Sequence, residues 1–385
     1  MPWKVKNPMS EKEQFIQQWL RKEFSFIALC EQFEIAPKTG YKWVERFKEG
    51  GLEALADRSH ARHTPPPWSI SLRVRDLILN ARVAHPTWGP RKLRAWLESR
   101  HPRIRLPAPS TIGDLLKRNG LVQERRRRAK PVRPSVLPFD DTAGPNAVFC
   151  IDFKGWFRTR DGARCNPFTV TDANSRFLLC CQHLERGTSV LVQEQLERLF
   201  QEYGLPKVIH SDNGAPFGSQ GLGGLSQLSV WLMSFGVDVS FIKPGHPEQN
   251  GRHERMHRTL ELEVASQPAA SLKLQQRAFD RFRHEYNWER PHEALENKTP
   301  GSVHVPSPRR WPPVVEEPEY PLAEEVRRVR GTGEIKWRGK RVFVGEAFIG
   351  EMLGLVPREE GRYELMLRNR MLGVLDEREG RIRKA

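Results

Sequence analysis

Two segments decide the fold of this chain: Val208–Gly214, with the sequence V-I-H-S-D-N-G, and Pro244–Arg255, with the sequence P-G-H-P-E-Q-N-G-R-H-E-R. The first predicts a short buried strand that ends in a turn, with Asp212 at its edge. The second predicts a rigid loop, because proline and glycine disfavour helix, followed by a helix with Asn250 at its N-cap and Glu254 about one turn inside. An acid at a strand end and an acid near a helix start can face one metal-sized space.

A third acid, Asp152, lies upstream in V-F-C-I-D-F at positions 148–153. There an ionisable side chain interrupts an otherwise apolar strand. A carboxylate in apolar surroundings is costly to desolvate unless it meets a cation. We therefore predict that Asp152, Asp212 and Glu254 are both the catalytic residues and the metal ligands of one site.

The residues around these acids carry a family resemblance. The motifs are I-D-F-K-G around Asp152, S-D-N-G-A-P-F around Asp212, H-P-E-Q-N-G-R-H-E-R around Glu254, and a later Y-N-x-x-R-P-H-x-A-L followed by T-P at 299–300. In this order they resemble the DDE catalytic core of bacterial insertion-sequence transposases, a family that shares its core with retroviral integrases. The resemblance covers roughly residues 140–305.

The resemblance implies a cofactor and a reaction. Two hard divalent cations about 4 Å apart, Mg²⁺ or Mn²⁺, prefer oxygen ligands and can assist phosphodiester chemistry. By this resemblance Asp152 bridges the two ions, Asp212 binds one and Glu254 the other. Activated water would cut at the element's end, and the freed 3′-hydroxyl would then attack target DNA.

The identity of the third acid has a competing answer. Glu248 leaves 35 residues after Asp212, the spacing known for many integrase-like enzymes, whereas Glu254 leaves 41. Glu254 nevertheless matches the family's position, three residues after Asn-Gly, and a helix holds a carboxylate more rigidly than a Pro-Gly loop does. The Gly-rich insert at 218–224 can house the six extra residues. We therefore favour Glu254 and expect Glu248 to be solvated near the helix's positive end.

The same helix also contains H-E-x-x-H, at His253–His257, which is the zinc-protease pattern. Two histidines four residues apart share a helix face and could hold zinc. Such a site needs a third ligand and apolar surroundings, whereas this helix carries Arg252, Arg255 and Arg258. We prefer a DNA role, in which His257 and Arg258 contact phosphate near the metal ions.

Composition favours a polyanionic partner. The net charge of +16 and a pI near 9.9 suit a protein that neutralises phosphates, although a basic protein with no such partner has the same composition. No stretch has the apolar length of a membrane span, and the N-terminus lacks a signal-peptide core, so we expect a cytoplasmic location in a bacterium, associated with the nucleoid. The five cysteines show no C-x-x-C pair, so no structural zinc knuckle is indicated.

Residues 1–60 predict a helix-turn-helix DNA-binding domain. Helices are expected at 11–21, 25–33 and 37–48, with Ser10 and Ser25 as N-caps. The third would enter the major groove, although any small three-helix bundle also has a polar face. Its predicted DNA-binding residues are Lys38, Thr39, Lys42 and Arg46.

Residues 68–130 predict a second DNA-binding unit with a basic tail. Helices are expected at 70–84, 91–100 and 110–118, the last capped by Ser110. A basic run is often a solvated tail, but after a DNA-reading unit we favour phosphate or minor-groove contact. The predicted DNA-binding residues are Ser110, Thr111, Lys117, Arg118, Arg125, Arg126, Arg127 and Arg128.

Residues 140–305 predict an α/β core with three strands and then alternating helix and strand, the order of the ribonuclease-H-like fold. Asp172 lies in hairpin-turn sequence, so a structural role is favoured over a catalytic one. Asn287, Arg290 and His292 fit packing and DNA contact equally well. Beyond a proline-rich linker, five short strands within residues 325–385 predict a small SH3-like β-barrel.

Together these features predict a multidomain DDE transposase that binds double-stranded DNA, both the terminal inverted repeats of a mobile element and the target. A homo-multimer is expected, because two DNA ends must be brought together. Two alternatives stay open: a structure-selective nuclease on the same fold, and a DNA-binding regulator with an inactive core. The presence of all three acids weighs against the regulator.

Overall fold

The chain separates into two compact units, residues 1–70 and residues 71–385. The computed structural model describes residues 8–57, 70–122, 144–312, 317–359 and 361–384. In the residues described, no helix combines the length and the apolar composition that crossing a bilayer requires.

The first unit is the predicted helix-turn-helix bundle. It contains α1 (Pro8–Arg21), α2 (Phe26–Gln32), α3 (Pro37–Gly50) and the short η1 (Leu52–Leu55). Ser25 caps α2, as predicted, by accepting a hydrogen bond from the Ala28 amide. The prediction that Ser10 caps the first helix is wrong, because that helix already begins at Pro8.

The second helical unit has α4 (Leu72–Ala84), α5 (Pro90–Arg100) and α6 (Pro109–Arg118). Its buried residues, which include Ile78, Leu93 and Ile112, form one cluster with the fully buried Trp88. The predicted N-cap at Ser110 is wrong: Pro109 occupies the first helical turn, where its missing N–H costs nothing, and the cap falls on Ala108.

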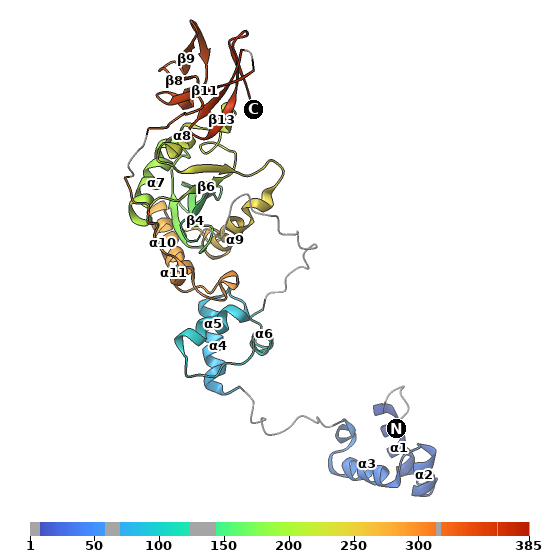
Figure 1. Ribbon diagram of the computed structural model, residues 1–385. Coiled ribbons are helices and arrows are strands. Elements are labelled where there is room, and N and C mark those ends of the chain that lie inside the picture. Colours follow the sequence, from blue (N-terminus) through green and yellow to red (C-terminus); the bar gives the residue numbers. More distant parts are fainter. Residues whose placement is uncertain (1–7, 58–69, 123–143, 313–316, 360, 385) are drawn as a thin grey trace. The chain divides into compact units, whose positions relative to one another are not determined.

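Residues 144–312 are built on a five-stranded mixed sheet in the order β5-β4-β1-β6-β7, of which β4 and β6 are labelled in Figure 1. The strand β1 pairs antiparallel with β4 and parallel with β6. This is the ribonuclease-H-like arrangement that the strand order predicted. The five strands are β1 (Val148–Phe153), β4 (Pro167–Asp172), β5 (Leu178–His183), β6 (Val208–Ser211) and β7 (Asp238–Phe241), with a small hairpin of β2 (Phe157–Arg158) and β3 (Arg164–Cys165) beside them.

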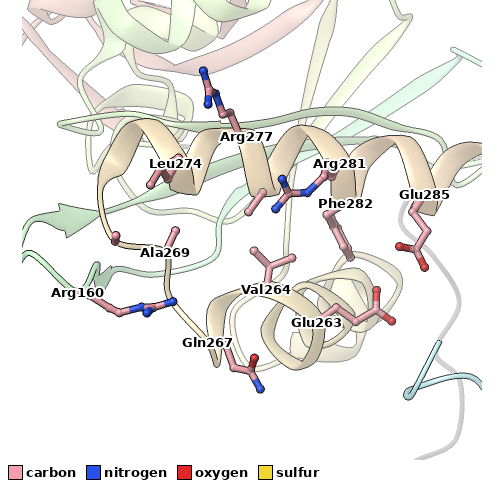
Figure 2. A pocket seen from close by; sticks show the side chains of 12 residues that line it. Arg160, Glu263, Val264, Gln267, Ala269, Leu274, Arg277, Arg281, Phe282 and Glu285 are labelled. Carbon is pink, nitrogen blue, oxygen red and sulfur yellow. The ribbon is translucent and has the colours of Figure 1, made fainter. Parts of the chain in front are cut away.

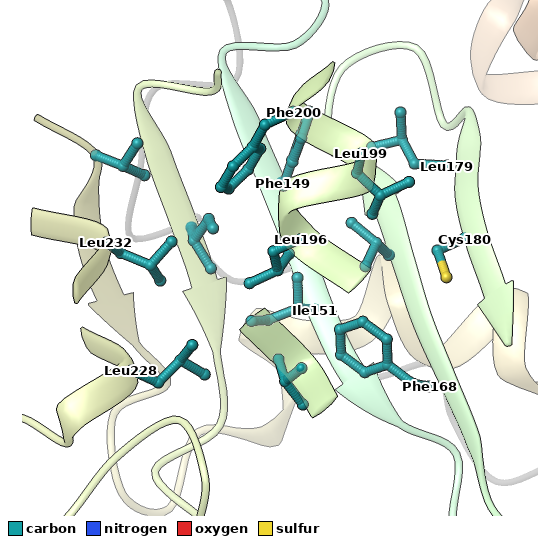
Figure 3. Packing of buried hydrophobic residues seen from close by; sticks show 14 of the residues in the cluster. Phe149, Ile151, Phe168, Leu179, Cys180, Leu196, Leu199, Phe200, Leu228 and Leu232 are labelled. Carbon is teal, nitrogen blue, oxygen red and sulfur yellow. The ribbon is translucent and has the colours of Figure 1, made fainter. Parts of the chain in front are cut away.

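Helices cover both faces of this sheet because its strands are apolar on both sides. On one face α7 (Ser189–Tyr203) and α8 (Gln227–Ser234) pack against side chains such as Ile151 and Phe168 (Figure 3). On β5, Leu179 belongs to that cluster, whereas Leu178 belongs to the cluster of the other helices. These are α9 (Gly251–Leu260), its π-helical extension (Glu261–Ala265) and α10 (Leu272–Trp288).

Three short helical segments complete the core: η3 (Pro247–Asn250), η5 (Glu293–Leu295) and α11 (Pro300–Val303). The segment η3 lies directly before α9, so the chain is already helical when it reaches the acid-bearing helix.

The C-terminal part is an antiparallel sheet in the order β14-β13-β12-β11-β8, with a separate β9-β10 hairpin. The predicted barrel is not confirmed, because these pairings form an open sheet and a hairpin. Its strands are β8 (Glu325–Arg328), β9 (Glu334–Trp337), β10 (Lys340–Phe343), β11 (Met352–Glu359), β12 (Arg362–Leu367), β13 (Arg370–Asp376) and β14 (Arg381–Lys384), with η6 (Glu346–Phe348) between β10 and β11.

The Gly-rich insert packs against this C-terminal sheet. Leu222, in η2 (Leu222–Gly224), and Leu225 share a buried cluster with Leu372 of β13. A hydrogen bond also joins the C-terminal sheet to the core sheet: the Arg370 side chain on β13 donates to the Val239 carbonyl on β7 at 3.0 Å. The extra residues between Asp212 and Glu254 therefore provide packing surface for the C-terminal sheet.

Polar side chains tie the second helical unit to the core. Glu263 accepts hydrogen bonds from Thr87 and from Arg290, the latter at 2.5 Å, and His85 Nδ1 lies 2.8 Å from a Glu285 oxygen. Figure 2 shows both glutamates together at one end of a groove that α10 borders. None of the three predicted acids lines this groove. The buried Arg290 guanidinium also lies over the Trp88 ring.

We predict that Glu263→Gln lowers the free energy of unfolding of the compact unit formed by residues 71–385 by about 3 kcal/mol. The reason is that this change leaves the buried charge of Arg290 uncompensated. Chemical denaturation followed by tryptophan fluorescence measures the change. Glu98→Gln is the control, since Glu98 pairs with Arg94 at 2.9 Å on the surface, and its loss should cost less than about 1 kcal/mol. Equal effects of the two changes would contradict the prediction.

Candidate metal and nucleic-acid site

Asp152 and Asp212 lie at the same ends of two neighbouring parallel strands. The register pairs Cys150 of β1 with His210 of β6. Continued for two more residues, it sets Asp152 level with Asp212, which directly follows β6. Both carboxylates are partly buried. The carboxyl ends of parallel strands are where α/β folds place ligand-binding groups, so the sheet itself brings these two acids together.

A residue at the start of α9 contacts the first acid. Asn250 Nδ2 donates a hydrogen bond to Asp152 Oδ2 at 3.1 Å. Asn250 does occupy the N-cap position of α9, as predicted, but its side chain makes no capping bond. The prediction of a capping role is wrong for that reason. Glu254 follows in the first turn of α9 and is exposed.

The Thr169 hydroxyl fixes α9 to the sheet. Thr169 lies opposite Asp152 in the β1–β4 ladder. Its Oγ1 donates to the Asp152 carbonyl at 3.0 Å and lies 2.8 Å from His253 Nε2 and 2.7 Å from His257 Nε2. A hydroxyl has one proton, and a carbonyl can only accept, so both imidazoles must donate to Thr169 through Nε2.

The second ring nitrogen distinguishes the two histidines. His253 Nδ1 lies 2.8 Å from Thr171 Oγ1, which can donate to it, so both nitrogens of this buried ring are satisfied within the protein. His257 Nδ1 instead faces Asp152 Oδ2 at 3.9 Å. The H-E-x-x-H histidines therefore contact threonines of β4 and do not converge as a zinc-protease pair, although ligand atoms of Asp152, His253 and His257 all lie within 4.8 Å of one another.

Burial and nearby charge make ionised Asp152 unfavourable. Desolvation, then the negative charge of Asp212 and to a smaller extent that of Glu254, raise the pKa of Asp152 to about 7 against the opposing hydrogen bond from Asn250. Burial lowers the pKa of His257 to about 4 and holds the pKa of His253 well below its ordinary value. Both imidazoles are therefore neutral at pH 7, which agrees with their hydrogen bonds.

Glu248, the competing third acid, has a different neighbour. Its carboxylate lies 2.8 Å from His246 Nδ1, and this hydrogen bond lowers the pKa of Glu248, which is partly exposed. The acids whose charge raises the pKa of Asp152 are Asp212 and Glu254. This electrostatic coupling favours Glu254 as the third acid.

Several other candidates have structural roles. Asp172 is fully buried and accepts hydrogen bonds from the Asn146 amide at 2.9 Å and the Ser175 amide at 2.8 Å, as expected for a turn residue. Buried Asn287 bonds both backbone groups of Leu178. Arg290 is likewise buried and bonds Glu263, and the partly buried His292 packs against Tyr286, so packing explains this family motif better than DNA contact does.

The predicted DNA-binding residues are mostly at the surface. Lys38 and Lys42 are exposed on α3, with Arg46 beside the Trp43 ring and Thr39 partly buried. The predicted residues Ser110, Thr111, Lys117 and Arg118 are exposed on α6, and Arg258 is exposed on α9. The basic run Arg125, Arg126, Arg127 and Arg128 lies outside the described residues. The His257 ring is turned inward, toward Thr169, so its position does not favour phosphate contact.

Family models match successive parts of the chain. They are a helix-turn-helix domain over residues 11–63, a homeodomain-like domain over 39–116, the integrase core domain over 142–247 and 235–300, and the IS481 family transposase C-terminal domain over 324–383. Two of these models describe an integrase core and a transposase C-terminal domain, and the chain is similar to proteins of insertion elements. The two integrase-core matches include the segments that carry Asp152, Asp212 and Glu254.

Relatives agree with this assignment over part of their length. The chain is 29% identical over 188 residues to the insertion element IS407 uncharacterized 31.7 kDa protein of Burkholderia multivorans, covering 48% of this chain and 65% of that protein. It is 25% identical over 241 residues to the IS476 uncharacterized 39.2 kDa protein of Xanthomonas euvesicatoria, covering 61% and 65%. The match thus spans slightly less than two thirds of either relative.

A solved structure with a detectable likeness is the HTLV-2 integrase catalytic core domain in complex with magnesium. The likeness covers 42% of this chain and 98% of that one, at 16% identity and a TM-score of 0.34.

Sequence reasoning missed the threonine and histidine contacts that position α9. Thr169 and Thr171 alternate on β4, so they share one face of the sheet, and His253 and His257 share one face of α9. These two spacings were the sequence features from which the threonine–histidine contacts could have been predicted. The role of Asn250 had no such signal, because an asparagine before a helix predicts a cap.

We predict that Asp152→Asn stabilises the chelator-treated protein at pH 8. The raised pKa means that folding favours the protonated acid, so wild-type stability falls as pH rises from 3.8, the ordinary value, to about 7. Asparagine removes this penalty, worth on the order of 3 kcal/mol. Differential scanning calorimetry at pH 5 and pH 8 measures it. The gain from asparagine should be larger at pH 8, and a gain that does not depend on pH would refute the electrostatic explanation.

We predict that Thr169→Val lowers the free energy of unfolding by about 2 to 5 kcal/mol, because two buried imidazole donors lose their acceptor. Thr171→Val is the matched control on the same strand and should cost about 1 to 3 kcal/mol, since it removes the partner of one ring nitrogen. Urea denaturation compares them. A smaller loss for Thr169→Val than for Thr171→Val would show that the hydroxyl does not hold both histidines.

Proposed function

We propose that this protein is a metal-dependent transposase that binds the ends of a mobile DNA element, cuts them and joins them to target DNA. The observation that carries the proposal is the coupling of three acids. Asp152 on β1 and Asp212 directly after β6 lie at the same ends of two adjacent parallel strands, and the charges of Asp212 and Glu254 both raise the pKa of Asp152.

The donor set fits Mg²⁺ or Mn²⁺, because three carboxylates supply the oxygen ligands that these ions prefer. Asp152, Asp212 and Glu254 would together hold these ions. When bound, the ions supply positive charge that makes the attacking oxygen more acidic and stabilises charge on the attacking and leaving oxygens. The energetic cost of ionised Asp152 is itself an argument for cations, since a positive charge would lower its pKa again.

The protein's own residues do the positioning. Asn250 fixes one Asp152 oxygen by a hydrogen bond, and Thr169 holds Asp152 and α9 together. Glu254 is therefore placed by a helix that two buried or nearly buried histidines secure to β4. The exposed Arg258, one turn further along α9, is suited to bind a DNA phosphate next to the acids.

The helical units would select the DNA. The exposed cations of α3 and α6 suit contact with DNA ends that carry terminal inverted repeats. We propose that a homo-multimer brings two such ends and the target together, because each strand transfer needs one acid cluster at one end. The contacts of His85 and Thr87 with Glu285 and Glu263 hold the second helical unit, α4 to α6, against the core.

A structure-selective nuclease with the same core is the remaining alternative, and a regulator with an inactive core is a further one. The nuclease would cut DNA without joining it, and the regulator would bind DNA without cutting it. Both helix-turn-helix matches and the transposase C-terminal match favour the joining enzyme.

We predict that Asp152→Asn, Asp212→Asn and Glu254→Gln each reduce strand transfer by more than about 100-fold, the scale of losing a group that stabilises transition-state charge. The assay joins labelled element-end DNA to a plasmid with Mg²⁺ or Mn²⁺. Glu248→Gln is the matched control and should keep activity within about threefold, because its carboxylate faces His246.

Each result of this assay separates the functional classes. Cleavage without joining by the wild-type protein would favour the nuclease, and binding without cleavage the regulator. Loss of joining only in Glu248→Gln would overturn the assignment of the third acid.

A further inference from the structure

His257 has one ring nitrogen with a role in the fold and one that faces the acids. Its Nε2 donates to Thr169 Oγ1, because that hydroxyl gives its single proton to the Asp152 carbonyl. In the neutral ring the remaining nitrogen, Nδ1, carries a lone pair. His257 Nδ1 lies 3.9 Å from Asp152 Oδ2, and the His257 side chain is only 13% exposed.

A lone pair and a carboxylate oxygen facing each other across this distance are two acceptors with no proton donor between them. The gap is too long for a hydrogen bond. Ligand distances of about 2.1 Å allow one cation to bridge atoms up to about 4.2 Å apart. One divalent cation can therefore bind both His257 Nδ1 and Asp152 Oδ2 after a small side-chain adjustment, since octahedral ligands lie about 3.0 or 4.2 Å apart.

The surrounding contacts preorganise this pair. Thr169 fixes the tautomer and orientation of His257, in the way that a hydrogen bond to the second nitrogen orients a metal-bound histidine. Asn250 fixes the carboxylate of Asp152 through the same oxygen. His253 cannot take this role, since Thr169 and Thr171 occupy both of its nitrogens.

We propose that His257 Nδ1 is a further metal ligand, binding the same cation as Asp152, and that this nitrogen favours Mn²⁺ over Mg²⁺ in that position. Magnesium prefers a shell of oxygen ligands, whereas transition-metal ions accept imidazole nitrogen readily. The inference deepens the proposed function, since it concerns the same cation site. It is tested by metal binding alone, so it stands or falls separately from strand transfer.

The test is pulsed electron paramagnetic resonance of Mn²⁺ bound to the full-length protein. The wild-type protein should show electron spin-echo modulation from a directly bound ¹⁴N nucleus. Labelling histidine with ¹⁵N should change the modulation frequencies without changing the protein. The wild-type protein giving no nitrogen modulation would overturn the inference.

Two glutamine variants locate the nitrogen. In His257→Gln the side-chain amide can still donate to Thr169, but the ring nitrogen is gone. It should lose the modulation, bind Mn²⁺ about 10-fold more weakly and bind Mg²⁺ within about twofold of wild type. His284→Gln, at an exposed histidine of α10, should keep the modulation. Persistence of the modulation in His257→Gln would overturn the inference.

The strand-transfer result is read separately. Nitrogen modulation in a protein that cannot join DNA would support the ligand role of His257 and reject the proposed function. The opposite result is strand transfer that depends on Asp152 together with bound Mn²⁺ that shows no histidine nitrogen. It would support the proposed function and reject the ligand role of His257.

Discussion

The negative charge of Asp152 is held where the folded protein disfavours it. The side chain is only 20% exposed, and Asp212 and Glu254 add like charges nearby, which together with burial raises its pKa to about 7. Such an arrangement is costly for stability unless a cation compensates it. The fold maintains it with a hydrogen bond from Asn250 and with Thr169, which joins the backbone of Asp152 to the histidines of α9. These contacts resist relaxation of the acid cluster.

The larger architecture supports this cluster from both sides. The parallel pairing of β1 with β6 sets two acids level, and α9 brings the third, with 41 residues between Asp212 and Glu254. The long interval between the acids is explained by the Gly-rich insert, whose Leu222 and Leu225 pack in the core of the C-terminal sheet. The interval thus reflects how the C-terminal part is attached to the core. Likewise, the family motif at Asn287 and Arg290 proves to be buried structure that joins β5, the π-helical turn and the second helical unit.

Much of this could be predicted from the sequence, because local patterns determine it. Apolar strands and periodic helices gave the order of elements in the core, and three short acid-bearing motifs gave the candidate acids. The errors arose where a residue has two possible partners. Asn250 has the composition of an N-cap, but a carboxylate 98 positions earlier in the chain takes its side chain. Ser110 was expected to cap α6, but Pro109 starts that helix first. The inward orientation of His257 depends on Thr169 from another strand, and no local pattern reports that contact. Closure of the C-terminal strands into a barrel depends on long-range pairing, which alternation of residues alone does not determine.

The central claim is that Asp152, Asp212 and Glu254 together hold divalent cations. Anomalous X-ray diffraction from crystals soaked in Mn²⁺ tests it most directly. We expect a manganese peak within about 2.5 Å of carboxylate oxygens of both Asp152 and Asp212, and a second peak next to Glu254. The absence of a peak shared by Asp152 and Asp212 at saturating Mn²⁺ would contradict this claim. A manganese peak at Glu248 in place of Glu254 would contradict it too.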